Sequence, residues 1–382
     1  MLTEKWLVGS SRWTVKNIFE IFVLWRLFLL LIALVVPVFF ELQDNFIGGG
    51  RQLYIQNPLF WGHVNFDGEH YLAIAQRSYR DLEYFYFPGY PLLVKSITQL
   101  ISSSVTVYAV VGLLISHLSF FLTLVGFYKL VKLDFKENVA KWSLIALLVF
   151  PTSFYFASFY TESIFLMLVI WSFYFARKKM YLFSGLLGAF ASATRLVGVV
   201  LLPALFWDKT KLFKKVSLVV VPTGLIIYIL YLNKVTGDPL EFLHSVEIFG
   251  SQRSSTLILL PQVFYRYIFK ILPSLDYSYF PVILTTFLEF SVASVFSALT
   301  VLTFFRLRPS YAIYTTLAFL IPTFSGSFSS LPRYVLVLFP AFILFGRWLS
   351  TCRKFSRIVF IAGSALLLTV AFGLFFRGFW IS

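Results

Sequence analysis

Residues 18–40 read IFEIFVLWRLFLLLIALVVPVFF, an apolar stretch whose only charged residues are Glu20 and Arg26. A helix needs about 20 mostly apolar residues to cross a bilayer. The runs lack the alternation of polar and apolar residues typical of a membrane barrel. The sequence therefore predicts an all-α protein, a polytopic transmembrane helical bundle. Comparable runs lie at 105–128, 216–232, 281–305 and 358–376.

The composition excludes a soluble protein. Hydrophobic residues make up 59% of the chain and charged residues only 13%, whereas soluble domains carry about 25% charged residues. The net charge of +15 does not indicate nucleic-acid binding, because Lys and Arg cluster at the ends of apolar runs, as in Arg177-Lys178-Lys179. That pattern is typical of cytoplasmic loops. The one cysteine, Cys352, cannot form a disulfide framework.

Placing the basic loops in the cytoplasm predicts one domain, residues 1–382, with about ten or eleven membrane-entering helices. Residues 18–40 act as an uncleaved signal anchor. Residues 41–104 form a long first extracytoplasmic loop, with interfacial helices near 70–80 and 91–101. A second extracytoplasmic segment spans 233–280. The remaining spans are expected at 142–157, 161–176, 311–324 and 334–346.

Residues 181–207 are long enough for one crossing, yet basic loops flank them on both sides. Two cytoplasmic loops require an even number of crossings between them. Two half-helices, 181–194 and 197–207, resolve the conflict. Broken helices are tolerated at membrane depth where they line a cavity, so Arg195 is expected at an apex facing one.

The first external loop holds the leading candidates for chemistry. Asp67, Glu69 and His70 lie within four residues of one another, and a partly desolvated carboxylate can take a proton from an alcohol. An alternative is that Asp67 caps the following helix. A divalent cation held by Asp67 and Glu69 is a further alternative, although the histidines show no metal-ligand spacing and no metal site is predicted.

Two arginines are candidates for binding phosphate. An arginine within the membrane region, such as Arg195, indicates an anion site by default, and its planar fork suits phosphate. The alternative is an arginine that snorkels to the interface. Arg333 lies in an external loop, against the positive-inside trend. Glu162 stands at a tight turn between two short helices, where it could instead cap the second one.

The ordered set of motifs resembles the PIG-V-type (GPI mannosyltransferase II-like) membrane glycosyltransferase family. Residues 66–75, FDGEHYLAIA, and 85–93, FYFPGYPLL, are similar to the family's first-loop signature. The resemblance spans roughly residues 60–345. Further matches are Tyr160-Thr161-Glu162-Ser163, the stretch from Gly188 through Arg195 to Gly198, residues 237–243, and Arg333-Tyr334.

The resemblance implies the GT-C fold class. It also implies inverting transfer of a sugar from a polyprenyl-phosphate carrier to a lipid or glycan acceptor on the extracytoplasmic face. Mannose is the usual donor sugar of the family. Asp67 is then the candidate base, with Glu69 as the other catalytic candidate. No cofactor is required, and the partners are the donor, the acceptor and membrane lipids. Substrate or phosphate contacts are expected from His70, Tyr71, Glu162, Arg195, Arg333 and Tyr334.

Two other functions stay open. A flippase or transporter of a polyprenyl-linked sugar should show internal repeats and polar residues at the membrane midplane, and neither is evident. A non-catalytic membrane assembly subunit would need no carboxylate in the first loop. The expected location is a prokaryotic cytoplasmic membrane, or alternatively the endoplasmic reticulum with a lumenal site.

Overall fold

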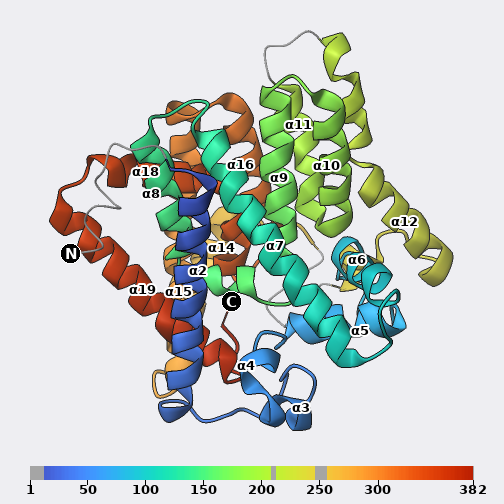
Figure 1. Cartoon of the computed structure of the whole chain (residues 1–382), viewed down its shortest axis with the longest axis vertical. Coiled ribbons are helices and arrows are strands. Elements are labelled where there is room, and N and C mark those ends of the chain that lie inside the picture. The colour runs from blue at the N-terminus through green and yellow to red at the C-terminus, as the bar shows by residue number, and fades with distance from the viewer. Residues whose placement is uncertain (1–12, 208–211, 246–255, 382) are drawn as a thin grey trace.

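The computed structural model describes residues 13–207, 212–245 and 256–381. Every regular element within these ranges is helical (Figure 1). Part of the predicted segment 233–280 lies outside the described residues. The all-α class is therefore confirmed.

Five helices in the described part are long and apolar enough to cross a membrane, and they match the five long apolar runs of the sequence. A polytopic bundle is therefore confirmed. They are α2 (Val15–Val35) extended by η1 (Val36–Val38), α7 (Val105–Val131), η4 (Leu212–Val220) with α12 (Thr223–Thr236), α15 (Phe280–Arg306), and α19 (Lys354–Phe376).

The ten or eleven membrane-entering helices predicted include shorter runs and half-helices besides these five spans. The predicted span 334–346 is bent by 81° between η7 (Val335–Val337) and α18 (Phe339–Thr351). Pro340 stands in the first turn of α18, where proline starts a helix but cannot continue one. The other short apolar helices are α8 (Glu137–Leu148), α9 (Glu162–Arg177), α10 (Tyr181–Thr194), α11 (Leu201–Phe206) and α16 (Pro309–Thr323).

The predicted break at Arg195 is confirmed. Helix α10 ends at Thr194, Arg195 is extended, and the chain continues as η3 (Leu196–Val200) into α11. A Cβ on Gly198 would lie 2.4 Å from the carbonyl carbon of Ala191. Only glycine therefore allows η3 to fold so closely against the end of α10.

The segment after α2 forms four helices beside one end of the bundle (Figure 1). Tyr90, on the last of them, donates a hydrogen bond of 2.9 Å to the carbonyl of Gly112 in α7, which anchors this layer. The helices predicted near 70–80 and 91–101 are found, shifted by two or three residues. The four are α3 (Arg51–Gln56), α4 (Pro58–Trp61), α5 (Asp67–Arg77) and α6 (Gly89–Thr98).

Farther along the chain lie four more short elements: α13 (Glu241–His244), α14 (Leu260–Arg266), the π-helical turn Tyr267–Ile271 and α17 (Leu331–Tyr334). The far end of the bundle is held by an ionic cluster. Asp134, after α7, accepts hydrogen bonds from Arg177 Nη2 at 2.9 Å and Arg308 Nη2 at 2.8 Å. This cluster joins the ends of α7 and α9 to the start of α16.

Candidate active site

The start of α5 is held by Asn65, a fully buried residue. Its amide donates a hydrogen bond of 2.9 Å to the carbonyl of Phe375 and accepts one of 2.8 Å from the backbone of Gly48. Tyr160 donates a hydrogen bond of 2.9 Å to the Asn65 carbonyl. The loop at Gly48, the turn before α9 and the end of α19 therefore fix the backbone just before Asp67.

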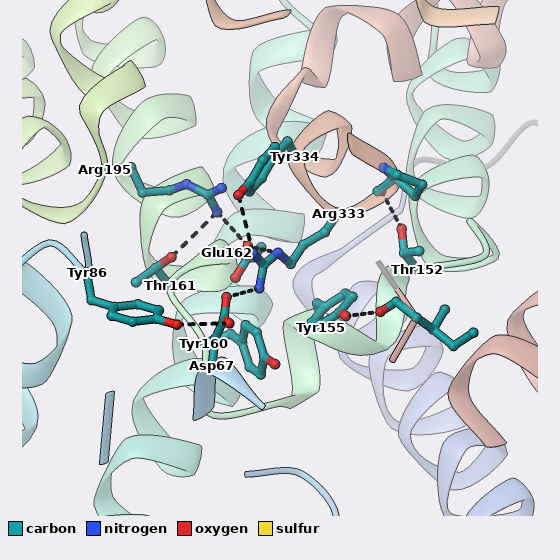
Figure 2. Close-up of polar contacts among 12 residues, drawn as sticks. Asp67, Tyr86, Thr152, Tyr155, Tyr160, Thr161, Glu162, Arg195, Arg333 and Tyr334 are labelled. Atoms are coloured by element: carbon teal, nitrogen blue, oxygen red, sulfur yellow. Dashed lines mark hydrogen bonds and ion pairs between the residues drawn. The ribbon is translucent and has the colours of Figure 1, made fainter. Parts of the chain in front are cut away.

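Asp67 is the first helical residue of α5, and the N-cap position belongs to Phe66. The carboxylate of Asp67 forms an ion pair with Arg333 through one oxygen. The other oxygen accepts a hydrogen bond of 3.2 Å from the Tyr86 hydroxyl (Figure 2). The carboxylate thus points to other elements of the fold, which is not the capping role considered from sequence.

Arg333 is 5% exposed and lies among aromatic rings. Its guanidinium carbon is 5.4, 5.3 and 5.2 Å from the ring centroids of Tyr155, Tyr160 and Tyr334. Such contacts stabilise a cation that has lost its water. Its Nε also lies 3.5 Å from Oε1 of Glu162, so this arginine contacts two carboxylates.

Arg195 reaches the same cluster from the break between α10 and η3. Its Nη1 lies 2.6 Å from Oε1 of Glu162 and 3.5 Å from the Thr161 hydroxyl, and its guanidinium carbon lies 5.2 Å from the Tyr334 ring centroid (Figure 2). The side chain therefore faces the interior and does not snorkel. Glu162, the first residue of α9, is 1% exposed and bridges the two arginines.

The cluster contains two arginines and two carboxylates, and pairing offsets the cost of burying each charge. Glu162 Oε2 is buried and has no hydrogen-bond partner. The two guanidinium groups are largely buried and fixed in orientation by these pairs, so an anion that reached them would require no further ordering of the arginines. This is the arrangement that makes electrostatic stabilisation of a developing negative charge effective.

Asp67 and Arg333 both line two cavities. The first cavity, of about 390 Å³, extends from Arg195 and Glu162 to the apolar face of α16 at Ala318 and Ile321. The second cavity, of about 530 Å³, includes His70 and Trp380. Phe85 and Tyr334 also line both cavities. The ion pair therefore stands at a wall that the two cavities share.

The remaining candidates on α5 separate in space. Tyr71 lines the first cavity. His70 lines the second cavity and stacks on the Tyr86 ring at a centroid distance of 4.9 Å. Glu69 lines neither of these two cavities. Burial raises the pKa of Glu69 to about 7, opposed by the charge of His70.

Glu83 also lines the second cavity, although the sequence did not predict it as a site residue. Burial tends to raise the pKa of Glu83, but hydrogen bonds from His70 and Arg77 outweigh this and lower it to about 2. The pKa of His70 is raised overall, because its hydrogen bond to Glu83 and the charge of Asp67 outweigh the effect of burial, which lowers the pKa. Glu83 thus holds His70 at the wall of the second cavity.

Three other tyrosines at the site were not predicted from the sequence as site residues. Tyr86 contacts Asp67, and Tyr155 and Tyr160 surround Arg333. Tyr86 and Tyr160 each lie inside motifs that carry the family resemblance, and this position could have identified them as site residues. Tyr155 lies outside these motifs, so nothing in the sequence identified it. Within residues 13–207, 212–245 and 256–381, no group of three or more His, Cys, Asp or Glu side chains is arranged to hold a metal ion.

Residues 16–222 match the family model described as Mannosyltransferase (PIG-V). The match includes Asp67, Glu162 and Arg195, and ends before Arg333. No curated protein matches the chain. Because the match covers more than half of the chain, this integral membrane protein belongs to the PIG-V family of mannosyltransferases.

Proposed function

We propose that the enzyme takes mannose from a polyprenyl-phosphate carrier and transfers it, with inversion at the anomeric carbon, to an acceptor hydroxyl. The observation that carries the proposal is the Asp67–Arg333 pair at the wall shared by two cavities. A candidate base and a candidate phosphate ligand lie together there, with separate room for two substrates.

The first cavity suits the donor. Arg195 and Arg333 stand at its polar end, and guanidinium forks bind phosphate oxygens well. Its other wall, formed by Ala318, Ile321 and Pro322 of α16, suits an apolar prenyl chain. The charges of the two arginines and two carboxylates sum to zero, which favours a singly charged phosphodiester over a more highly charged diphosphate.

In the proposed reaction Asp67 accepts the proton of the acceptor hydroxyl. The acceptor oxygen forms a bond to the anomeric carbon as the bond from that carbon to the phosphate oxygen breaks. The electron pair leaves with the polyprenyl phosphate, and Arg195 and Arg333 stabilise the added negative charge. The transition state resembles the oxocarbenium ion of glycoside hydrolysis, with a sugar or lipid hydroxyl in place of water.

The basic clusters support an extracytoplasmic site. Arg177 and Arg308 bind Asp134 at the far end of the bundle from α5, and Lys129 and Lys132 lie close to Asp134 in sequence. Under the positive-inside rule that end faces the cytoplasm. Asp67 then faces the outside, where polyprenyl-linked donors would be used.

The test is transfer by the purified protein in nanodiscs, with radiolabelled polyprenyl-phospho-mannose and a membrane lipid extract. We expect Asp67→Asn to lower transfer by about 10²-fold or more, the usual contribution of a general base. Asp134→Asn breaks a comparable buried ion pair at the other end and should keep activity per folded molecule. Because arginines supply the positive charge, transfer should persist in EDTA. Equal activity of wild type and Asp67→Asn would refute the role of Asp67.

A further inference from the structure

The segment between α5 and α6, residues 78–88, forms neither helix nor strand. It carries Tyr86, whose hydroxyl donates the hydrogen bond to Asp67 (Figure 2). Its second half is buried, and Tyr84, Tyr86 and Phe87 are each at most 7% exposed. A buried backbone without regular pairing must find other partners for its carbonyl groups. The groups that bind these carbonyls therefore decide where the Tyr86 hydroxyl lies.

The first half of the segment folds back on α5. The carboxylate of Glu83 accepts hydrogen bonds of 2.6 and 3.0 Å from Arg77 and one of 3.0 Å from the backbone of Arg80. Ser78 and Leu82 turn the chain with positive φ values of 66° and 73°. Residues other than glycine rarely adopt such values unless the surrounding contacts hold them. This half is therefore fixed to α5.

The second half of the segment is held by two tyrosine hydroxyls. Tyr228 lies in α12 and is 1% exposed. Its hydroxyl donates a hydrogen bond of 2.6 Å to the carbonyl of Tyr84, and a longer one of 3.4 Å to the carbonyl of Tyr86. The Tyr79 hydroxyl donates a hydrogen bond of 2.5 Å to the same Tyr86 carbonyl. The buried carbonyls are thus satisfied by one donor from the segment itself and one from a membrane span.

Aromatic packing holds the same part of the segment against α12 and α13. The ring centroid of Phe87 lies 5.1 Å from that of Tyr228, and Phe87 meets Phe242 of α13 edge-on at 5.4 Å. Phe242 belongs to residues 237–243, one of the motifs that carry the family resemblance. The proposed reaction gives this motif no role. Packing against the segment supplies one.

Tyr86 connects this support to the candidate base. Its ring stacks on His70 at 4.9 Å and meets Tyr71 edge-on at 5.1 Å, so its hydroxyl cannot move independently of its backbone. Tyr86 and Arg333 bind different oxygens of Asp67. A shift of Tyr86 would therefore change the direction in which the Asp67 carboxylate faces an acceptor hydroxyl.

Building on the proposed role of Asp67 as the base, we propose that Tyr79 and Tyr228 are positioning residues for the transfer reaction. Neither side chain lines either of the two cavities, so both act through Tyr86. Their hydroxyls hold the backbone at residues 84–86, which keeps the Tyr86 hydroxyl on Asp67. The span that contains α12 thus orients the base through the first loop.

Tyrosine-to-phenylalanine variants test this, because they remove the hydroxyl and keep the ring. We expect Tyr228→Phe and Tyr79→Phe each to lower kcat about 5-fold, the usual effect of one hydrogen bond, with little change in the KM for the donor. The acid limb of the kcat–pH profile should move to higher pH, because a carboxylate that loses a hydrogen bond binds its proton more tightly. Tyr90→Phe is the matched control and should change neither, since the fully buried Tyr90 hydroxyl bonds the Gly112 carbonyl instead.

A double variant shows whether the effect runs through Tyr86. In a Tyr86→Phe background, Tyr228→Phe should lower kcat no further, since two changes on one route are not additive. The same loss in both backgrounds would overturn the proposal, as would a wild-type kcat and pH profile in Tyr228→Phe. The charged groups around the Asp67 carboxylate are the same in every variant: Arg333, Glu162 and His70.

Hydrogen–deuterium exchange of residues 78–88 in nanodiscs requires no transfer, so it separates this inference from the proposed function. We expect faster exchange in Tyr228→Phe than in wild type or Tyr90→Phe. Faster exchange in a protein whose wild type transfers no mannose would support the contact and contradict the proposed function. An active wild type with an inactive Asp67→Asn variant, but with unchanged exchange and kcat in Tyr228→Phe, would support the transferase and overturn the positioning role.

Discussion

Arg333 forms an ion pair with Asp67 across 266 positions of the chain. Both side chains are largely buried, and both line the two cavities. Asp67 begins α5 in the first loop, whereas Arg333 lies in α17 near the bend before α18. The candidate base and a candidate phosphate ligand thus act as one unit, and substitutions at the two positions should not be additive.

The first prediction concerns the shape of the two guanidinium groups. We expect Arg333→Lys to lower transfer by about 10²-fold or more, because Lys cannot contact Asp67 and Glu162 together and cannot stack among three tyrosines. Arg195→Lys should cost less, since an ammonium group can still pair with Glu162. The measurement is kcat and KM for the donor in both variants. Equal losses of activity in the two variants would show that the additional contacts of Arg333 do not matter for transfer.

A second prediction separates the two acids of α5. Glu69→Gln should keep transfer activity within a few-fold of wild type, because Glu69 lines neither cavity, whereas Asp67→Asn should abolish most of it. Initial rates at saturating donor, at matched amounts of folded protein, provide the comparison. A loss in Glu69→Gln as large as that in Asp67→Asn would make Glu69 the base.

Sequence reasoning located the broken helix at Arg195 because charge parity required it. It also placed Glu162 and Arg333 at the same end of the bundle as Asp67. It could not predict the Asp67–Arg333 contact, since no local pattern relates positions so far apart. Tyr86, Tyr155 and Tyr160 were missed as site residues because the chain contains 21 Tyr and 47 Phe. Aromatic identity alone therefore distinguished nothing.

The membrane helices show the same limit. Hydropathy identified the apolar segments correctly, yet it does not show whether a segment forms one unbroken helix. The run 334–346 looks continuous in sequence but bends by 81° after Val337. Pro340 indicates a helix start, but it does not set the angle. The segment before the bend is tied to a distant part of the chain, since the hydroxyl of Thr152, just before η2 (Ser153–Ala157), donates a hydrogen bond of 2.6 Å to the Pro332 carbonyl.

A third prediction tests how Arg195 is positioned. We expect Gly198→Ala to reduce both activity and thermal stability, because its Cβ would lie 2.4 Å from the backbone of Ala191 and would push η3 off α10. Gly363→Ala is the control, since a Cβ there meets nothing within 4 Å. Unfolding temperature and initial rate would be measured on the same preparations. Wild-type activity in Gly198→Ala would show that the approach of η3 to α10 does not position Arg195.

The last prediction concerns stability against pH. Glu69 has a folded-state pKa of about 7, above its ordinary value of 4.5. The folded protein therefore holds this proton more tightly than the unfolded chain, and stability falls as pH rises from 4.5 to 7. Glu69→Gln should remove this loss. The free energy of unfolding of wild type should therefore fall by about 2 kcal/mol more than that of the variant between pH 4 and pH 8. That figure allows for partial solvent screening.

Glu83 provides a comparison of opposite sign. Its pKa is lowered to about 2, so its contribution is present above pH 4.5 and is lost as pH falls from 4.5 towards 2. Glu83→Gln should therefore be less stable than wild type at pH 7, with the difference shrinking in acid. Unfolding temperatures of the three proteins in one detergent, from pH 2 to 8, check both signs. A Glu69→Gln variant with the same pH slope as wild type would show that Glu69 ionises freely in the folded enzyme.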